Sequence, residues 1–397
     1  MPGFELFGDA EKAHVQDVLD SGVLMRYGFD ANRNGHWKAA ALEQALAKRM
    51  KVGHTQLVSS GTAALTVAMA SAGVGAGDEV IIPTFTFVAT FEAILALSAI
   101  PVMVNVDDSL TLDPKAVEKA ISKKTKVIMP VHMCGSMADL GALKSICQDH
   151  GLLLIEDACQ AIGGSYEGKP LGSYGDLGCF SFDYVKTITC GEGGAIITNN
   201  GKYYKNADHY SDHGHDHIGK DRGAEEHPFL GYNFRISELN AAVGLAQIQR
   251  LDEFLELQKE RYAILQEALK TIPEITFRKV PKGGVENYSF LNFFLPGREI
   301  AKNVHKALMD GGIDACFYWY DNNWHYHRKW EHLKDLESLG RFPKEVYDQL
   351  PTYAEGNFVQ SDYWVGRNIS ALIKLSWSLK EVRQRAKTMV RIIQEMI

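Results

Sequence analysis

Residues 55–200 alternate between short apolar runs and segments with the spacing of helices. The apolar runs read TQLVS, DEVIIP, IPVMVNVD, TKVIMPVHM, GLLLIED, LGCFSF and GAIITN. Most are apolar throughout, which is typical of strands that helices cover on both faces. The pattern predicts an α/β fold with a large, mostly parallel sheet, whose ligands bind beyond the carboxyl ends of the strands.

The second half of the chain has a different pattern. Residues 235–269 contain no proline and repeat apolar residues every three or four positions, which predicts one or two long amphipathic helices. Short predicted strands follow, in ITFRKV, YSFLNFFLP and IKLSWS, with one helix near residues 299–311 and another at the end of the chain. We expect a large α/β domain at residues 1–250 and a smaller α+β domain at residues 251–397.

Composition narrows the classes of function. The chain is 46% apolar and 23% charged, as in soluble globular proteins, and its net charge of -7 argues against a general binder of nucleic acid or anionic membranes. No window approaches 18 consecutive apolar residues and no basic segment precedes an apolar one near the start, so we expect a cytoplasmic protein. The six cysteines form no C-x-x-C pair, which argues against a zinc ribbon or a disulfide framework.

The motif SSGTAAL, residues 59–65, follows one predicted strand and opens a helix. The first N–H groups of a helix have no partner within it and face outward, so Gly61 and Thr62 are candidates for binding a phosphate. The alternative is ordinary capping of the helix by Ser60 or Thr62.

Two further motifs follow predicted strands. LLLIEDACQAIGG places Glu156 and Asp157 at a strand end, with Gln160 three residues beyond Asp157. A carboxylate there either caps a helix or meets a cation, such as a protonated ring nitrogen. PTFTFVAT supplies Phe85 and Phe87, which either pack in the core or stack on a planar cofactor.

Lys186 lies in SFDYVKTITCGEGG, a glycine-terminated turn between two predicted strands. A lone lysine is usually a solvated surface residue. Here, however, a phosphate site, an aromatic plate, a carboxylate and a lysine occur in chain order within one sheet domain. Pyridoxal phosphate needs all four, with the lysine for a Schiff base and the carboxylate to keep the pyridine nitrogen protonated.

Two other motifs are weaker indications of a nucleotide site and of a metal site. GGSYEGKP resembles a P-loop, but Pro170 replaces the required Ser or Thr. HYSDHGHDHIGKD clusters four histidines with aspartates, but the spacing matches no closed structural zinc site. We therefore predict no metal and interpret the cluster, His209, His213, His215 and His217, as a polar flap near the active site.

The sequence resembles the pyridoxal-phosphate-dependent sugar aminotransferases of the DegT/DnrJ/EryC1/StrS family over nearly its whole length. The motifs that carry the resemblance are SSGTAAL, PTFTFVAT, EDACQAIGG, GDLGCFSFDYVKTITCGEGGAIITN and GYNFRISELNAA. The resemblance implies the type I, or aspartate aminotransferase, fold and a homodimer that builds each active site from both subunits.

The resemblance also implies roles for individual residues. Lys186 corresponds to the Schiff-base lysine, Asp157 to the partner of the pyridine nitrogen, Gln160 to a residue near the ring hydroxyl and Phe87 to the stacked plate. The residues that would hold the phosphate are Gly61, Thr62, Ser181 and, from the neighbouring subunit, Asn233. The implied reaction has two halves, in which Lys186 moves a proton as general base and acid and glutamate is the expected amino donor.

The substrate is indicated by departures from the usual family pattern at the N-terminus, in FYWYDNNWHYHRKW and in ISALIKLSWS. These resemble the branch that aminates C8 of 8-oxo-3-deoxy-manno-octulosonate to give 8-amino-3,8-dideoxy-manno-octulosonate for lipopolysaccharide. Arg26 is the candidate cation for the substrate carboxylate, and the other candidate contacts are Tyr27, Tyr320 and His325. The alternatives are a nucleotide-linked 4-keto or 3-keto sugar and, disfavoured because both Lys186 and Asp157 are present, a non-catalytic regulator that binds the cofactor.

Overall fold

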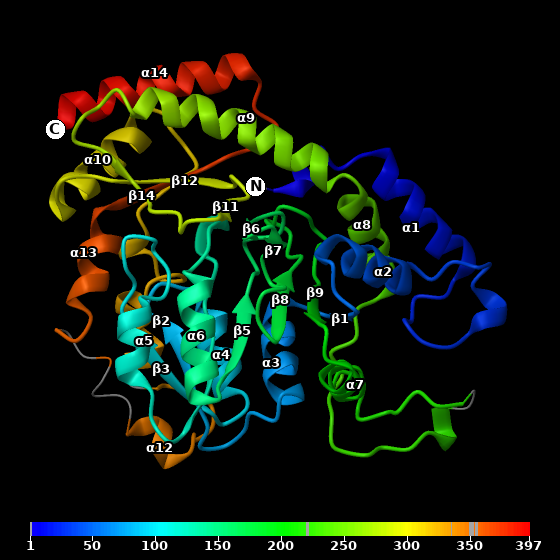
Figure 1. The fold of residues 1–397 in the computed structure, drawn as a ribbon. Coiled ribbons are helices and arrows are strands. Elements are labelled where there is room, and N and C mark those ends of the chain that lie inside the picture. Colours follow the sequence, from blue (N-terminus) through cyan, green and yellow to red (C-terminus); the bar gives the residue numbers. More distant parts are fainter. Residues whose placement is uncertain (1, 220–221, 335, 349–352, 354–355) are drawn as a thin grey trace.

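A computed structural model describes residues 2–397 except 220–221, 335, 349–352 and 354–355 (Figure 1). Its largest sheet has seven strands in the order β1-β9-β8-β5-β4-β2-β3. Their bounds are β1 His54–Val58, β2 Glu79–Pro83, β3 Ile100–Val104, β4 Thr125–Ile128, β5 Leu153–Asp157, β8 Leu177–Ser181 and β9 Gly194–Thr198. Strand β9 is antiparallel to both its neighbours and every other pairing is parallel. The predicted α/β fold with a mostly parallel sheet is confirmed.

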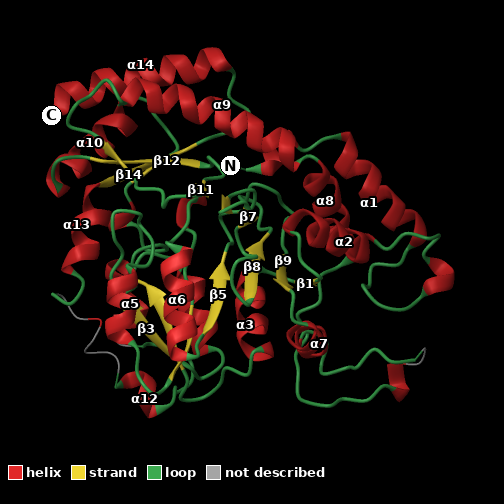
Figure 2. Ribbon diagram, in the orientation of Figure 1, coloured by secondary structure: helices red, strands yellow, loops and turns green. Residues whose placement is uncertain are grey.

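Helices cover both faces of this sheet (Figure 2). One face packs on α3 (Gly61–Ser71), α4 (Val88–Leu95) and α7 (Gly201–Tyr210), and the other packs on α5 (Pro114–Ala120) and α6 (Leu140–His150). Successive residues of β2 serve the two faces in turn: Val80 and Ile82 belong to the first core and Ile81 to the second. Burial on both sides explains why these strands are apolar throughout.

A second sheet lies beside the first, with four strands in the order β10-β12-β14-β13. These strands are β10 (Thr276–Phe277), β12 (Phe290–Phe294), β13 (Cys316–Phe317) and β14 (Asn368–Leu372), and α9 (Leu251–Leu269), α10 (Arg298–Asp310) and α14 (Leu379–Met396) pack around them (Figure 1). The strand predicted in IKLSWS was wrongly placed, because β14 ends at Leu372, just before that segment. A three-stranded sheet of β6 (Ser165–Tyr166), β7 (Lys169–Pro170) and β11 (Gly284–Val285) joins the two halves of the chain.

The predicted helical stretch at residues 235–269 forms two helices, α8 (Glu238–Gln249) and α9, which meet at Arg250. Residues beyond Arg250 also contribute to the core of the first sheet. Short helices η5 (Trp319–Asp321), η6 (His327–Lys329), α11 (Glu331–Lys334) and α12 (Lys344–Tyr347) precede α13 (Val359–Arg367). Trp330, Leu333 and Phe358 pack into the core on the α3 and α4 face of the first sheet. Part of the second half therefore covers one face of the large sheet.

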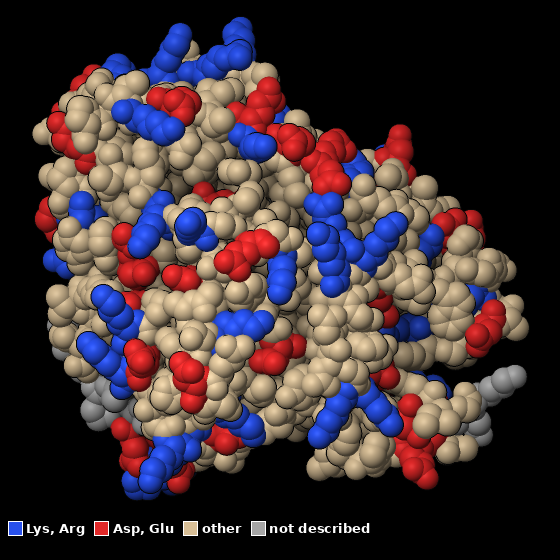
Figure 3. All heavy atoms as spheres, viewed as in Figure 1, with Lys and Arg blue, Asp and Glu red and all other residues tan. Residues whose placement is uncertain are grey.

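The N-terminal residues form η1 (Gly3–Leu6), α1 (Asp9–Ser21), η2 (Asp30–Asn32) and α2 (Lys38–Met50), and both α1 and α2 pack on α8. A long loop that contains η4 (Arg222–Ala224) extends away from the body of the molecule after α7 (Figure 1). On the face drawn in Figure 3, acidic and basic side chains are interspersed. Within the described part of the chain, no helix combines the length and the apolar character needed to span a bilayer.

Candidate active site

A cavity of about 370 Å³ lies at the carboxyl ends of β1, β2, β5 and β8. Eight of the residues predicted from the sequence line it: Gly61, Thr62, Phe87, Asp157, Gln160, Ser181, Lys186 and His325. They come from segments that lie far apart in the chain and meet because parallel strands end at the same edge of a sheet.

One end of the cavity is the N-terminus of α3. The Ser60 hydroxyl accepts a hydrogen bond from the Ala63 N–H at 3.0 Å, so Ser60 caps the helix. Gly61 lies against β8, since a Cβ at this position would be 2.6 Å from the Ser181 Cβ and 3.0 Å from its Oγ. The outward N–H groups of the helix and the hydroxyls of Thr62 and Ser181 form a cradle whose donors suit a phosphate. Capping and phosphate binding are thus compatible at this helix.

A buried carboxylate, Asp157, also lines the cavity and is 4% exposed. The Thr90 hydroxyl donates to its Oδ2 at 2.8 Å and the Cys159 N–H donates to its Oδ1 at 3.2 Å. Turns follow Asp157 in the chain, so it caps no helix. A buried carboxylate with these two neutral donors can stabilise an adjacent cation, which is the role of a partner for a protonated pyridine nitrogen.

Glu156, beside Asp157 in the sequence, points to the other side of the strand because successive side chains alternate. Its Oε1 accepts hydrogen bonds from the N–H groups of Tyr174 and Gly175, both at 2.7 Å, and its Oε2 accepts one from the Gly172 N–H at 2.8 Å. Its Oε2 also lies 2.9 Å from His132 Nε2. Glu156 therefore organises the loop before β8, and only one carboxylate of the Glu-Asp pair reaches the cavity.

Phe87 and Trp324 form an aromatic wall. Their rings stack, with centroids 5.6 Å apart and planes 16° apart, and Trp324 is 56% exposed. Phe85, the other aromatic candidate, is fully buried beside Trp319. Phe87 is therefore the phenylalanine of this motif that can face a planar cofactor.

Residues 324–327, here called the strap, position Trp324, the second ring of this wall. The strap runs along residues 84–88, where the Val88 N–H donates to the Trp324 carbonyl at 2.8 Å and the Thr86 N–H donates to the His325 carbonyl at 3.1 Å. Burial, with a smaller contribution from the charge of Lys186, lowers the pKa of His325 to about 3. The strap thus delivers a neutral imidazole to the cavity.

Lys186 lies on a turn that is closed by its own backbone. The Lys186 N–H donates to the Asp183 carbonyl at 3.0 Å, and the Cys190 N–H donates to the Phe182 carbonyl at 2.8 Å. Burial raises the pKa of the Cys190 thiol far above its usual range, so this cysteine is not a nucleophile.

Gln160 is held by the Cys134 N–H, which donates to its Oε1 at 2.9 Å.

Four predicted site residues do not line this cavity in their own chain: Arg26, Tyr27, Tyr320 and Asn233. Arg26 is 7% exposed and its guanidinium is paired with Glu43, which does not support a role in binding a substrate carboxylate. The Tyr27 hydroxyl donates to Asp208 at 3.0 Å, and Tyr320 lines a different cavity, of about 820 Å³. Asn233 lies on the extended loop, where its Oδ1 accepts a hydrogen bond from the Arg235 N–H at 3.2 Å.

The histidine-rich loop is an ion-paired network around Asp212. His217, Arg222 and Arg235 all contact this buried carboxylate. Although burial opposes it, the carboxylates of Asp208 and Asp212 on its two ring nitrogens raise the pKa of His217 to about 9. Across the described residues, no group of three His, Cys, Asp or Glu side chains is placed to hold a metal ion.

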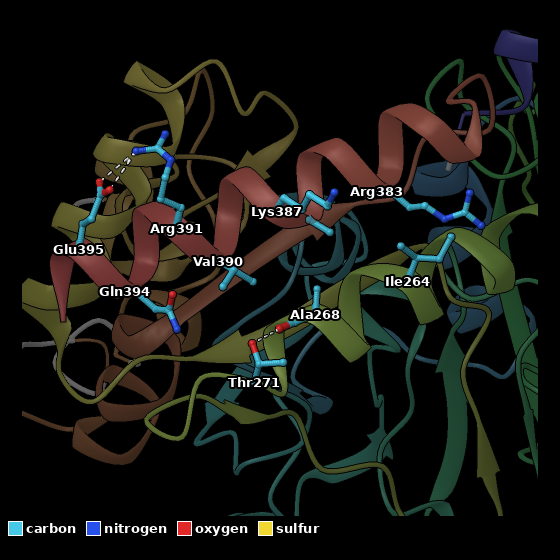
Figure 4. A pocket seen from close by; sticks show the side chains of 10 residues that line it. Ile264, Ala268, Thr271, Arg383, Lys387, Val390, Arg391, Gln394 and Glu395 are labelled. Atoms are coloured by element: carbon cyan, nitrogen blue, oxygen red, sulfur yellow. Dashed lines mark hydrogen bonds and ion pairs between the residues drawn. The ribbon is translucent and has the colours of Figure 1, made fainter.

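Other hollows and motifs do not compete with this cavity. A groove of about 700 Å³ between α9 and α14 is lined by Ile264, Ala268 and residues of α14, and one of its charged groups, Arg391, pairs with Glu395 (Figure 4). The P-loop-like segment forms the β6–β7 hairpin rather than the strand, loop and helix of a nucleotide site.

Sequence reasoning missed several residues of the cavity. Thr90 lies one helical turn after Phe87, and the position of Phe87 offered a signal for it. Asp183 and Glu192 flank Lys186 on the same turn, and Trp324 directly precedes His325. Only the fold shows that these four side chains share one cavity.

Comparison with known proteins agrees with this geometry. The model of the DegT/DnrJ/EryC1/StrS aminotransferase family matches residues 7–344. GDP-perosamine synthase of Vibrio cholerae is 35% identical over 286 residues, covering 72% of this chain and 74% of that protein. The 3-amino-5-hydroxybenzoate synthase of Amycolatopsis mediterranei is 35% identical over 322 residues, covering 79% of each chain.

Solved structures share the fold over almost the whole chain. The crystal structure of 3-amino-5-hydroxybenzoic acid synthase matches with a TM-score of 0.83 and 29% identity, covering 98% of this chain and 97% of that one. A sugar aminotransferase from Streptococcus pneumoniae, solved in its pyridoxal-phosphate form, matches with a TM-score of 0.83 at 23% identity, covering 98% of this chain and 97% of that one, a likeness that shows the fold alone. The predicted type I fold, the predicted enzyme class and the predicted cofactor are confirmed. The chain belongs to the DegT/DnrJ/EryC1/StrS aminotransferase family, and it is an aminotransferase that uses pyridoxal phosphate.

Proposed function

We propose that this sugar aminotransferase acts on the C8 aldehyde of 8-oxo-3-deoxy-manno-octulosonate, with glutamate as the amino donor, to give 8-amino-3,8-dideoxy-manno-octulosonate for lipopolysaccharide. The observation that carries the chemistry is the meeting of Lys186, Asp157 and the N-terminus of α3 in one cavity. The observation that favours this acceptor is that two segments with unusual sequence, at the N-terminus and around Trp324, both lie at the cavity or its lysine turn.

The residues of the cavity divide the work of the reaction. Pyridoxal phosphate, when bound, supplies an aldehyde that takes up the amino group and a ring that stabilises negative charge on the adjacent carbon. Lys186 would hold the cofactor through its Nζ and, when its amine is free, would accept and return a proton as general base and acid. Asp157 keeps the ring nitrogen protonated, and α3 with Ser181 anchors the phosphate. Phe87 fixes the plane of the ring.

A carboxylate on the acceptor requires a cation, and Lys186 is the one lysine or arginine among the described residues that line the cavity. Since Lys186 serves the cofactor, the cation for an acidic sugar would come from a second subunit. This need supports a homodimer with shared active sites as part of the proposal. Exposed apolar side chains support it further: Phe29 is 60% exposed, Leu230 91% and Tyr232 59%.

The extended loop that carries Leu230 and Tyr232 also carries Asn233, which does not reach the cavity of its own chain. In the proposed dimer, Asn233 of one subunit contacts the cofactor phosphate of the other. Mixing a Lys186→Ala chain with an Asn233→Ala chain tests this directly. Partial recovery of activity in the mixture is expected, because one of the two sites in a mixed dimer would be intact, and no recovery would contradict shared sites.

A nucleotide-linked keto-sugar is the second candidate acceptor, and the similarity to a GDP-perosamine synthase favours it. A single-turnover assay separates the two. The purified protein is loaded with glutamate, excess donor is removed, and the cofactor spectrum is followed after addition of either sugar. Return of the original spectrum with the octulosonate alone supports the proposal, and return with the nucleotide sugar alone overturns it.

A further inference from the structure

The N-terminal segment lies directly against the turn that carries Lys186. The Gly3 N–H donates a hydrogen bond to the Lys186 carbonyl at 2.9 Å. The Phe4 ring stacks on Tyr184, with centroids 4.2 Å apart and planes 7° apart. Two consecutive residues from the start of the chain thus contact the turn through its backbone and through a side chain two positions before Lys186.

The contact at Gly3 leaves no room for a side chain. A Cβ on Gly3 would lie 2.7 Å from the Thr187 carbonyl oxygen and 2.1 Å from Gln247 Oε1. The first of these atoms belongs to the turn itself, directly after Lys186, and the second belongs to α8. The N-terminal backbone is therefore wedged between the lysine turn and a long helix of the large domain.

Several hydrogen bonds hold the N-terminal segment against elements other than the lysine turn. Arg250 Nη1 donates to the Leu6 carbonyl at 2.7 Å, and Gln247 Nε2 donates to the Gly3 carbonyl at 3.4 Å. The Glu5 carboxylate accepts a hydrogen bond from the Ser376 N–H at 2.9 Å. Because these partners lie on α8 and in the loop before α14, the segment has a rigid support independent of the turn.

The lysine turn is supported unevenly: residues 187–190 are buried, and Asn240 Nδ2 of α8 donates to the Cys190 carbonyl at 2.7 Å, whereas the residues before Lys186 have few such supports. Tyr184 and Val185 are 54% and 49% exposed, and the internal bonds of the turn leave the Lys186 carbonyl without a partner inside it. Among the described residues, Gly3 donates the backbone hydrogen bond that this carbonyl accepts. Without the contact from Gly3, the exposed part of the turn, at Tyr184 and Val185, would sample several backbone positions.

We propose that Gly3 and Phe4 are positioning residues that clamp the Lys186 turn and set the direction of the lysine side chain toward the cofactor. This inference rests on the proposed function in that Lys186 is the residue that bears the cofactor. Holding a reactive group within a few tenths of an ångström of its working position is a large part of catalytic efficiency, and supporting contacts provide it. Loss of the clamp should loosen the turn without unfolding the domain, because Phe4 and Tyr184 meet at its surface.

The test uses two disrupting variants, Phe4→Ala and Tyr184→Ala, and a conservative one, Tyr184→Phe, which retains the stacked ring. Phe7→Ala is the matched control, because Phe7 is 47% exposed in the same segment and it bonds the Phe4 carbonyl through its backbone N–H, which the substitution keeps. The first readout is amide hydrogen exchange at Lys186, whose N–H donates to the Asp183 carbonyl in the exposed part of the turn, in protein prepared without cofactor. We expect at least tenfold faster exchange in Phe4→Ala and Tyr184→Ala, and unchanged exchange in Tyr184→Phe and Phe7→Ala.

The second readout is the absorbance of the cofactor-loaded protein, whose pH midpoint reports the environment of the nitrogen that Lys186 contributes. The two disrupting variants should shift this midpoint by at least 0.5 pH units, a criterion set for the experiment at about half of the spread that protein environments usually produce. Exchange and midpoint that stay at wild-type values in Phe4→Ala would overturn the proposal. Faster exchange in Phe7→Ala to the same degree would also overturn it, by showing a general loss of structure. If wild-type protein binds no cofactor, the proposed function fails, but the exchange experiment still decides whether the clamp exists.

Discussion

Replacing Gly61 by alanine tests the close approach of α3 to β8 on which the phosphate site depends. The added Cβ would lie 2.6 Å from the Ser181 Cβ, whereas carbon atoms in favourable contact are about 3.5–4.0 Å apart. Helix and strand must therefore separate by about 1 Å, and overpacking of this kind costs about 1–3 kcal/mol. The helix preference of alanine over glycine returns up to about 1 kcal/mol. The net loss expected in the free energy of unfolding is about 1–2 kcal/mol.

The same displacement moves the N–H groups of α3 away from the phosphate. If the cofactor loses a similar amount of binding free energy, its Kd rises about fivefold to thirtyfold, since about 1.4 kcal/mol corresponds to a factor of ten. Urea denaturation of cofactor-free protein measures the first effect and titration with pyridoxal phosphate measures the second.

Gly201→Ala is the matched control, because Gly201 is also the first residue of a helix and the nearest atom to its added Cβ, His54 Nε2, is at an ordinary 3.6 Å. This variant should keep its stability within about 0.5 kcal/mol or gain slightly. Ser181→Gly in the Gly61→Ala background removes the clashing Cβ and should recover part of the loss. Equal stability of Gly61→Ala and Gly201→Ala, or no recovery in the double variant, would refute the reasoning.

Four further predictions concern single side chains. Asp157→Asn should lower kcat about 100-fold or more in steady-state assays, as removal of one buried electrostatic contact does. The absorbance of the variant should show that the cofactor is still bound. Burial lowers the pKa of His325 to about 3, so over the range from about pH 6.5 to 3 only the unfolded chain takes up a proton at this residue. The free energy of unfolding of the wild-type protein should therefore fall as the pH drops through this range. In urea denaturation, His325→Gln should lose up to about 1.4 kcal/mol less of this free energy per pH unit. Arg26→Ala should lower the free energy of unfolding by about 3 kcal/mol by leaving Glu43 buried without its partner, and an increased KM for the sugar in a fully stable protein would contradict this. Trp324→Ala should raise the KM for the sugar about tenfold through loss of an exposed ring at the cavity, with the glutamate half-reaction unchanged and Trp324→Phe close to wild type in stopped-flow absorbance.

Local sequence patterns were sufficient for the residues that come from strand ends. Asp157, Gly61 and Ser181 each follow or end an apolar run, and the rule that ligands bind at the carboxyl edge of a parallel sheet places them together. Lys186 was predictable because its turn joins two recognisable strands. In these cases the position of a residue in its own element decides where its side chain lies.

Residues whose position depends on distant contacts were not predictable in this way. Trp324 reaches the cavity only because its strap pairs with residues 84–88, and no local pattern announces such a pairing. The sequence suggested that Arg26 could bind a substrate carboxylate, but its guanidinium forms an ion pair with Glu43 of α2. The misplaced strand has the same cause, since the pairing of β14 with β12 and β13, and not its own apolar run, sets its end.

The strap of residues 324–327 also sets the order in which the active site can be completed during synthesis. Lys186, Asp157 and the α3 cradle leave the ribosome well before the strap, which comes from the last fifth of the chain. Until then the nascent sheet has its lysine and its phosphate site but lacks one wall. Capture of the cofactor in a closed cavity is therefore a late event, and chains that terminate before the strap carry Lys186, Asp157 and the α3 cradle without forming the whole cavity.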